Sequence, residues 1–174
     1  FAERFDRLIA SGKAREALLV IPDGFTAFGG SQYLNSTATG RYADHVAVEL
    51  VSFIEDKFAV VRGPEGRALL GSSSGGFGAL TLGMRHPESF GHVAAHSADL
   101  GFDAAYHGDL LKLCAGLSRY GGSVAKFLAE FRASREKSTF DFAMLNAVAM
   151  AACYSPNPKS PLGFDLPVDL RTGE

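Results

Sequence analysis

The spacing of apolar residues predicts that strands and helices alternate along the first half of the chain. Three short apolar runs, bounded by Gly, Pro or polar residues, are typical of strands covered on both faces of a parallel sheet. The three runs are residues 17–21, 67–70 and 92–96. Helical spacing separates them at residues 42–57 and 74–85, and residues 2–10 predict a short amphipathic helix that Gly12 ends. This order predicts an α/β fold with a parallel sheet.

The second half of the chain has a different pattern, because no strand candidate follows residue 98 and the apolar spacing becomes helical. We interpret this part as a helical insertion after the third strand, which would cover the carboxyl edge of the sheet as a lid. Its apolar residues would contact an acyl chain, or would form ordinary core, which is the simpler interpretation for the apolar helix at residues 144–152. The candidates are Phe127, Phe131, Phe140, Phe142, Met144 and Met150. The proline-rich residues 155–167 predict an extended tail.

Length and composition favour one globular domain of 174 residues, of which 47% are hydrophobic. We expect residues 1–98 to form its sheet-bearing core and residues 99–174 its lid and tail. A formal charge of -2 gives no basic surface for nucleic acid or an anionic membrane, and no apolar run reaches the ~18 residues of a membrane span. Two cysteines without a CxxC spacing favour a reducing compartment, so the expected location is the cytoplasm.

A G-x-S-x-G motif at residues 71–75 lies between a predicted strand and a predicted helix. In this context Ser73 is the candidate nucleophile, held in a strained turn, and the backbone N–H of Ser74 is the candidate oxyanion donor. Gly71 and Gly75 would let the chain pass closely at the turn. The alternatives are a Gly/Ser-rich turn without chemistry and an anion-binding loop, but neither a P-loop Lys nor a dinucleotide fingerprint follows.

The loop of residues 25–40 has no hydrophobic period and carries the candidate substrate contacts Gln32, Tyr33 and Asn35. These side chains would contact substrate or satisfy the loop itself. His96 ends a predicted strand and would line the pocket, with a Ser73–His96–Asp99 triad and a simple capping role as alternatives.

A helical spacing of four also relates Asp99, Asp103 and His107. These residues could present a metal, but a solvated helix face is the better interpretation, so we predict no metal site.

Several stretches together resemble the esterases of the α/β-hydrolase fold that include enterochelin esterases, S-formylglutathione hydrolase (esterase D) and the mycolyltransferases. They are Ile21-Pro22-Asp23-Gly24, residues 29–36, Gly71 to Gly76, residues 85–91 and His96-Ser97-Ala98-Asp99. The resemblance implies a serine-dependent carboxylic ester hydrolase that acts on a small-molecule ester through an acyl-enzyme, without metal or organic cofactor. Acyl transfer by the same fold and a non-catalytic binding module are the alternatives.

The same resemblance implies that the catalytic acid and histidine lie beyond Glu174. It also implies a further strand that precedes residue 17 in the sequence and that lies, in the sheet, between the strands of residues 17–21 and 67–70. The chain therefore resembles an internal part of a longer hydrolase with an incomplete sheet. We expect missing segments, a complementing chain or homo-oligomer, or repacked strands to compensate for the gap, because unpaired buried backbone groups cost about 1–3 kcal/mol each.

Overall fold

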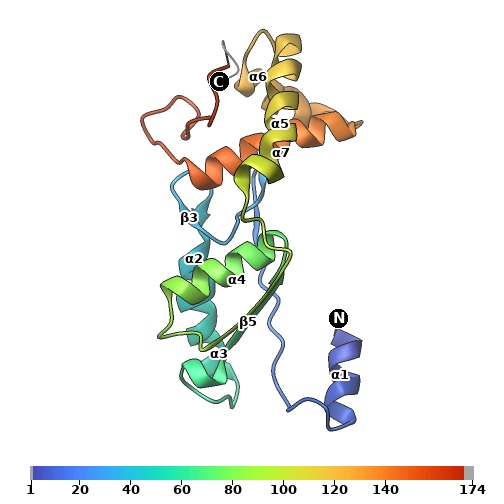
Figure 1. Cartoon of the computed structure of the whole chain (residues 1–174). Coiled ribbons are helices and arrows are strands. Elements are labelled where there is room, and N and C mark those ends of the chain that lie inside the picture. The colour runs from blue at the N-terminus through green and yellow to red at the C-terminus, as the bar shows by residue number, and fades with distance from the viewer. Residues whose placement is uncertain (1, 171–174) are drawn as a thin grey trace.

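The computed structural model describes residues 2–170 and shows a mixed helical and sheet fold (Figure 1). Helix α1 (Ala2–Ala10) forms as predicted, and Gly12 follows it with a φ of 71°. The strand predicted at residues 17–21 is wrong, because this segment is extended but has no ladder partner among the described residues. Its side chains are correspondingly exposed, Leu18 by 46% and Ile21 by 78%. An apolar run forms a stable strand only where a neighbouring strand accepts its hydrogen bonds.

The loop of residues 25–40 is more regular than the sequence predicts. Strand β1 (Phe25–Thr26) pairs antiparallel with β2 (Gly29–Gly30), and β3 (Asn35–Ser36) pairs antiparallel with β4 (Gly40–Arg41). Side-chain hydroxyls stabilise the two turns: Thr26 Oγ1 accepts from the N–H of Phe28 at 3.0 Å, and Ser36 Oγ accepts from the N–H of Ala38 at 3.1 Å. Ser36 Oγ also donates to the carbonyl of Ala152 at 2.6 Å, so the loop is tied to the C-terminal helical region.

The predicted helix at residues 42–57 is confirmed, but its middle is π-helical. It runs as α2 (Tyr42–Asp44), a π-helix (His45–Leu50) and α3 (Val51–Lys57). Ala43, Val46 and Ala47 are buried and share a small core with Leu82 and Phe90. A π-helical turn holds more residues than an α-helical one, so the residues that follow are rotated around the axis. Phe53, which the regular α-helical period places on the buried face, is therefore 53% exposed.

The centre of the fold is a β-α-β unit. Strand β5 (Ala68–Ser72) pairs parallel with β6 (His92–His96), in a register that runs from Ala68 opposite His92 to Ser72 opposite His96. Helix α4 (Ser74–Arg85) connects them and lies close to one face, since a Cβ at Gly83 would be 2.3 Å from Val93 Cγ2. Both strands and the helix are as predicted, with β5 ending two residues later. A partly buried ion pair between Arg67 and Glu55 joins the start of β5 to α3.

The C-terminal helical region consists of α5 (Phe102–Leu117), a 3-10 turn (Ser118–Tyr120), α6 (Val124–Ala133) and α7 (Thr139–Tyr154). Helix α6 begins at the Ser123 cap, and α7 begins at a capping box of Ser138 and Asp141. Helices α5 and α7 pack together around a core that includes Leu113, Phe127, Met144 and Val148.

The prediction of an extended tail is only partly right, because the chain after α7 folds back onto the helical region. Pro156 forms an isolated bridge with Phe164, and Phe164 is buried in the helical core with 1% of its surface exposed. An aromatic side chain supplies enough apolar area to hold such a segment in place. Within residues 2–170, no helix combines the length and the apolar character that crossing a membrane requires.

Candidate active site

Ser73 occupies the sharp turn between β5 and α4, in a backbone conformation that few residues adopt. Its φ of 55° and ψ of -123° are unusual for a residue with a side chain. The turn is held from both sides: the N–H of Ser73 donates to the carbonyl of His96 at 3.1 Å, and its carbonyl accepts from the N–H of Phe77 at 3.0 Å. Ser73 itself is exposed. Strain of this kind persists where surrounding structure holds it, and it is frequent at functional sites.

Glycines make this turn possible, although not all of those the sequence indicates. A Cβ at Gly71 would lie 2.0 Å from the carbonyl oxygen of Gly75, so the prediction that Gly71 must lack a side chain is confirmed. Gly76 also permits a close approach, since its Cβ would be 3.0 Å from the carbonyl oxygen of His96. At Gly75 a Cβ would meet nothing within 4 Å, so the expectation that this position must be small is wrong.

A line of hydrogen bonds leads from Ser73 into the protein. Ser73 Oγ donates to Asp99 Oδ1 at 3.1 Å, and the hydroxyl of Tyr106 donates to Asp99 Oδ2 at 3.3 Å. The amide nitrogen of Gln32 in turn donates to the Tyr106 hydroxyl at 3.0 Å. We call these four residues the Ser73 network. They come from the α4 turn, the segment after β6, helix α5 and the loop of residues 25–40, so only the tertiary structure joins them.

Tyr106 is the member of the network that the sequence analysis did not identify. Burial raises the pKa of Tyr106 to about 12, so its hydroxyl is protonated at neutral pH and can donate to the Asp99 carboxylate. The sequence holds one indication of Tyr106, namely helical spacing. Phe102 and Tyr106 are four residues apart in a helix that begins just after Asp99, so both lie on one face of that helix. A tyrosine on a mostly apolar face has no distinctive motif, so its role needed the structure.

The predicted substrate contacts are in different situations. Gln32 is buried, 2% exposed, and its amide also meets Met150 Sδ at 3.0 Å. Its carbonyl oxygen Oε1 has no hydrogen-bond partner among the described residues. Tyr33 packs against α4, since a Cβ at Gly78 would be 2.4 Å from its ring. Asn35 donates to Asp44 at 2.8 Å and accepts from the N–H of Asp44 at 3.2 Å, so its amide holds the start of α2. The hydrogen-bond partners of Asn35 therefore lie in α2 and those of the Gln32 amide in α5 and α7, and substrate contact by these two residues stays a prediction.

The exposed side chain of His96 lies beside Ser72 and not at the Ser73 hydroxyl. Its Nδ1 lies 3.4 Å from Ser72 Oγ, whereas Ser73 Oγ is bonded directly to Asp99. The structure therefore does not form the Ser73–His96–Asp99 triad considered as an alternative. Asp99, Asp103 and His107 are not in one helix, because α5 begins at Phe102. Over residues 2–170, the structure holds no group of three His, Cys, Asp or Glu side chains that could bind a metal ion.

An aromatic cluster adjoins the Ser73 network and consists of Phe77, Phe102, Tyr106 and Tyr154. The ring centroids of Phe102 and Tyr154 are 4.7 Å apart, and those of Phe77 and Tyr154 are 5.5 Å apart. The start of α5 and the end of α7 thus contact the first turn of α4. Of the apolar lid candidates, Phe127 and Met144 are fully buried core. Phe102 and Tyr154, which the sequence analysis did not single out, pack on Phe77 in the first turn of α4.

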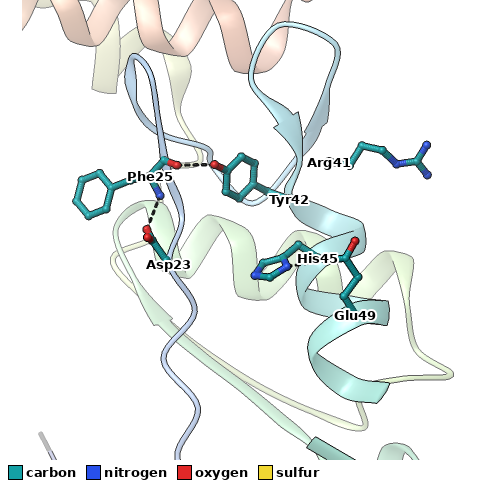
Figure 2. A pocket seen from close by; sticks show the side chains of 6 residues that line it. All are labelled: Asp23, Phe25, Arg41, Tyr42, His45 and Glu49. Carbon is teal, nitrogen blue, oxygen red and sulfur yellow. Dashed lines mark hydrogen bonds and ion pairs between the residues drawn. The ribbon is translucent and has the colours of Figure 1, made fainter. Parts of the chain in front are cut away.

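A separate hollow of about 400 Å³ lies between the segment before β1 and the start of the α2 helix (Figure 2). Its lining residues are Asp23, Phe25, Arg41, Tyr42, His45 and Glu49. The Tyr42 hydroxyl donates to the Phe25 carbonyl, and Asp23 Oδ1 accepts from the N–H of Phe25 at 3.0 Å. In Figure 2 the rings of Tyr42 and His45 extend toward this segment, whereas Arg41 extends away. Ser73 is not among the lining residues, so we do not assign this hollow to the serine.

Comparison with known proteins identifies the family of the chain. Residues 1–138 match the family Esterase, described as Putative esterase, and the chain belongs to this family. A stretch of 85 residues is 27% identical to the uncharacterized protein YbbA of Bacillus subtilis (strain 168), and it covers 49% of this chain. The match covers 31% of YbbA, so the chain spans about a third of the length of that relative. The family name indicates ester hydrolysis by an enzyme.

Proposed function

We propose that the protein is a serine-dependent carboxylic ester hydrolase in which Ser73 is the nucleophile. The observation that carries the proposal is the conformation of Ser73, which is exposed and held at φ 55° between a parallel strand and the N-terminus of a helix. The β5-α4-β6 unit is the part of the chain that supports an α/β-hydrolase core. Membership in an esterase family makes ester cleavage the reaction that fits this serine best.

In the proposed reaction Ser73 Oγ attacks the ester carbonyl and forms an acyl-enzyme, which water then hydrolyses. The N–H of Ser74, the first residue of α4, would donate to the oxyanion, and the positive end of the helix would stabilise its charge. Among the described residues, Asp99 is the acid in contact with Ser73 Oγ, and no imidazole contacts this atom. We propose that a histidine accepts the Ser73 proton, as the resemblance to esterases implies, and that Asp99 holds Ser73 Oγ by a hydrogen bond before substrate binds.

For the helical region we propose a lid role near its two ends. Phe102 and Tyr154 pack on Phe77, which is four residues from Ser73, so an acyl chain bound at Ser73 would meet these rings. Exposed His96 and half-buried Tyr33 are proposed to line the same mouth. Gln32 would act through Tyr106, because its amide is bonded to that hydroxyl in the interior.

A fluorophosphonate probe tests the nucleophile directly, since an activated serine forms a covalent adduct that intact mass spectrometry detects. We expect one adduct on Ser73, and hydrolysis of p-nitrophenyl acetate and butyrate that falls at least ~1,000-fold in Ser73→Ala. Ser72→Ala and Ser74→Ala are matched controls, because the proposed role of Ser74 uses its backbone N–H. Turnover that survives Ser73→Ala would refute the proposal.

One observation favours a second candidate, a hydrolase-like module that binds a ligand without turnover. Ser73 Oγ is bonded to a carboxylate rather than to an imidazole, and an unactivated serine hydroxyl is a weak nucleophile. This candidate predicts no probe adduct on Ser73 in the full-length protein. The esterase proposal predicts labelling there, so the same experiment separates the two.

A further inference from the structure

Asp99 is an anion without a cationic partner, next to the proposed nucleophile. It is half-buried, and both of its hydrogen-bond donors are neutral hydroxyls, those of Ser73 and Tyr106. Within residues 2–170, no Lys, Arg or His side chain forms an ion pair with it. A carboxylate oxygen can accept two hydrogen bonds, and among the described residues each oxygen of Asp99 accepts one from a side chain. An unpaired charge that is partly removed from water favours a ligand of opposite charge.

The tyrosine that donates to this carboxylate belongs to the aromatic cluster. Phe102 and Tyr106 are stacked with ring centroids 5.9 Å apart and an angle of 29°, and Phe102 is 45% exposed. An ammonium group is attracted to the face of an aromatic ring as well as to a carboxylate. A neutral acyl group would be stabilised by contact with the rings only, whereas a cation would be stabilised by the rings and by the Asp99 carboxylate. The combination of Asp99 with these rings is therefore suited to a positively charged group.

The distance between Ser73 Oγ and Asp99 also defines where on a substrate the positively charged group would lie. A carbonyl carbon ready for attack lies about 3–3.5 Å from the nucleophile oxygen. A nitrogen on the adjacent carbon is about 2.5 Å from the carbonyl carbon by standard bond lengths and angles. Because Asp99 Oδ1 is 3.1 Å from Ser73 Oγ, such a nitrogen can reach hydrogen-bond distance of Asp99 while Ser73 contacts the carbonyl.

We propose that Asp99, with Phe102 and Tyr106, recognises an ammonium group on the carbon next to the scissile carbonyl, so that the preferred substrates are α-amino acyl esters. This inference rests on the proposed esterase function and names its substrate class. When Ser73 Oγ turns toward the carbonyl, the substrate ammonium takes its place as donor to Asp99 Oδ1. Tyr106 and Gln32 are positioning residues, since they hold the other oxygen of Asp99 through the Ser73 network.

The test uses three methyl esters of the same shape, derived from alanine, lactic acid and propionic acid. They carry an ammonium, a hydroxyl and a hydrogen next to the carbonyl. Hydrolysis by the full-length protein is measured in a pH-stat at pH 6.5, where the amine, with an ordinary pKa of about 7.7–8.0, is protonated. We expect a kcat/KM for the alanine ester about tenfold above that for the propionate ester. In Asp99→Asn this ratio should fall to near one.

The ratio separates recognition from a general loss of activity, because any effect of Asp99→Asn on Ser73 itself changes both rates. Asp103→Asn is the matched control, since it removes an exposed carboxylate from the first turn of α5 and should leave the ratio unchanged. Raising the pH to 9 removes the ammonium charge and should remove the preference in the wild type. A wild-type ratio near one, or a preference for the lactate ester, would overturn the ammonium assignment.

A binding measurement keeps the inference testable without turnover. Ser73→Ala protein is titrated with alanine and propionate methyl esters and followed by ligand-observed NMR. Tighter binding of the alanine ester that is lost in the Ser73→Ala, Asp99→Asn double variant supports the inference. Equal binding of the two esters refutes it. Failure of the esterase proposal is a different result, namely hydrolysis that persists in Ser73→Ala.

Discussion

The helical region and the parallel strand pair bury their apolar side chains to very different degrees. In the helical region Leu113, Phe127, Met144 and Val148 are almost completely buried. In the strand pair every residue of β6 is exposed, and Leu70 of β5 is 61% exposed. Residues 17–21 are exposed as well. Figure 1 shows α5, α6 and α7 together at one end of the molecule, and β5 with α4, α2 and α3 toward the other.

The difference reflects where each kind of element finds its hydrogen-bond partners. A helix satisfies its backbone internally and needs only apolar contact, which α5, α6, α7 and Phe164 supply to one another. A strand needs a neighbour along its edge as well as a cover on its face. Helices can therefore complete a core from a contiguous stretch of sequence, whereas a parallel sheet depends on segments distant in the chain.

The largest effect is expected from truncating the centre of the helical core. Phe127→Ala removes a fully buried ring and should lower the free energy of unfolding by about 3–5 kcal/mol. Phe142→Ala is the control in the same region, because its side chain is 54% exposed and should cost less than about 1 kcal/mol. Urea unfolding followed by circular dichroism measures both. Equal effects would mean that the helical region is not the stable part of the molecule.

A smaller but more local effect is expected at the Ser73 turn. Gly71→Ala places a Cβ 2.0 Å from the carbonyl oxygen of Gly75, so the turn must shift, at a cost of about 2–3 kcal/mol. Labelling of Ser73 by a fluorophosphonate should be lost. Gly75→Ala introduces no contact and replaces glycine in a helix, so stability should stay the same or rise by up to about 1 kcal/mol. Retained labelling in Gly71→Ala would contradict the role of this close approach.

The junction between the two regions should respond to alkaline pH through Tyr106. Its pKa is raised from about 10 in the unfolded chain to about 12 in the fold, because burial disfavours the charged phenolate. The folded state therefore holds the proton more tightly, and stability is full below pH 10 and falls as the pH rises toward 12. Tyr106→Phe should cost about 1 kcal/mol at pH 7 through the lost bond to Asp99.

The control for this prediction is the difference in free energy of unfolding between the wild type and Tyr106→Phe, measured by urea unfolding at pH 8, 10 and 11.5. Burial also raises the pKa of Cys153 and of Tyr154, so both proteins lose stability in alkali. The wild type should lose more stability than Tyr106→Phe as the pH rises, so their free energies of unfolding should converge. A gap that stays constant over this range would show that Tyr106 does not titrate with folding.

The smallest effect is expected on the uncovered face of the sheet. Leu70→Thr keeps a side chain suited to a strand and removes an exposed leucine, so stability should change by less than about 0.5 kcal/mol. The measurement is the same urea titration on the full-length protein. A loss above about 2 kcal/mol would show that another segment or chain covers this face, which would remove the contrast between the two regions.

Secondary structure with a local cause was predictable from the sequence. Residues 2–10, 42–57, 74–85 and 92–96 form the predicted elements, because amphipathic spacing and end signals act within one segment. Residues 17–21 were predicted as a strand and are not paired, because pairing depends on another segment. The short strands between Phe25 and Arg41 were missed, since hydroxyl-stabilised turns leave no hydrophobic period.

The candidate site divides in the same way. The sequence by itself determined Ser73, its strand-to-helix setting and the need for Gly71, because a sharp turn imposes local steric demands on its own residues. Only the tertiary structure decided that Asp99 meets Ser73 directly, that Tyr106 and buried Gln32 support Asp99, and that His96 faces Ser72 instead. These contacts join segments up to 74 residues apart, and the packing of α5 and α7 against α4 sets their geometry. Contacts of this kind leave no spacing in the sequence, because their partners are neighbours only after the chain has folded.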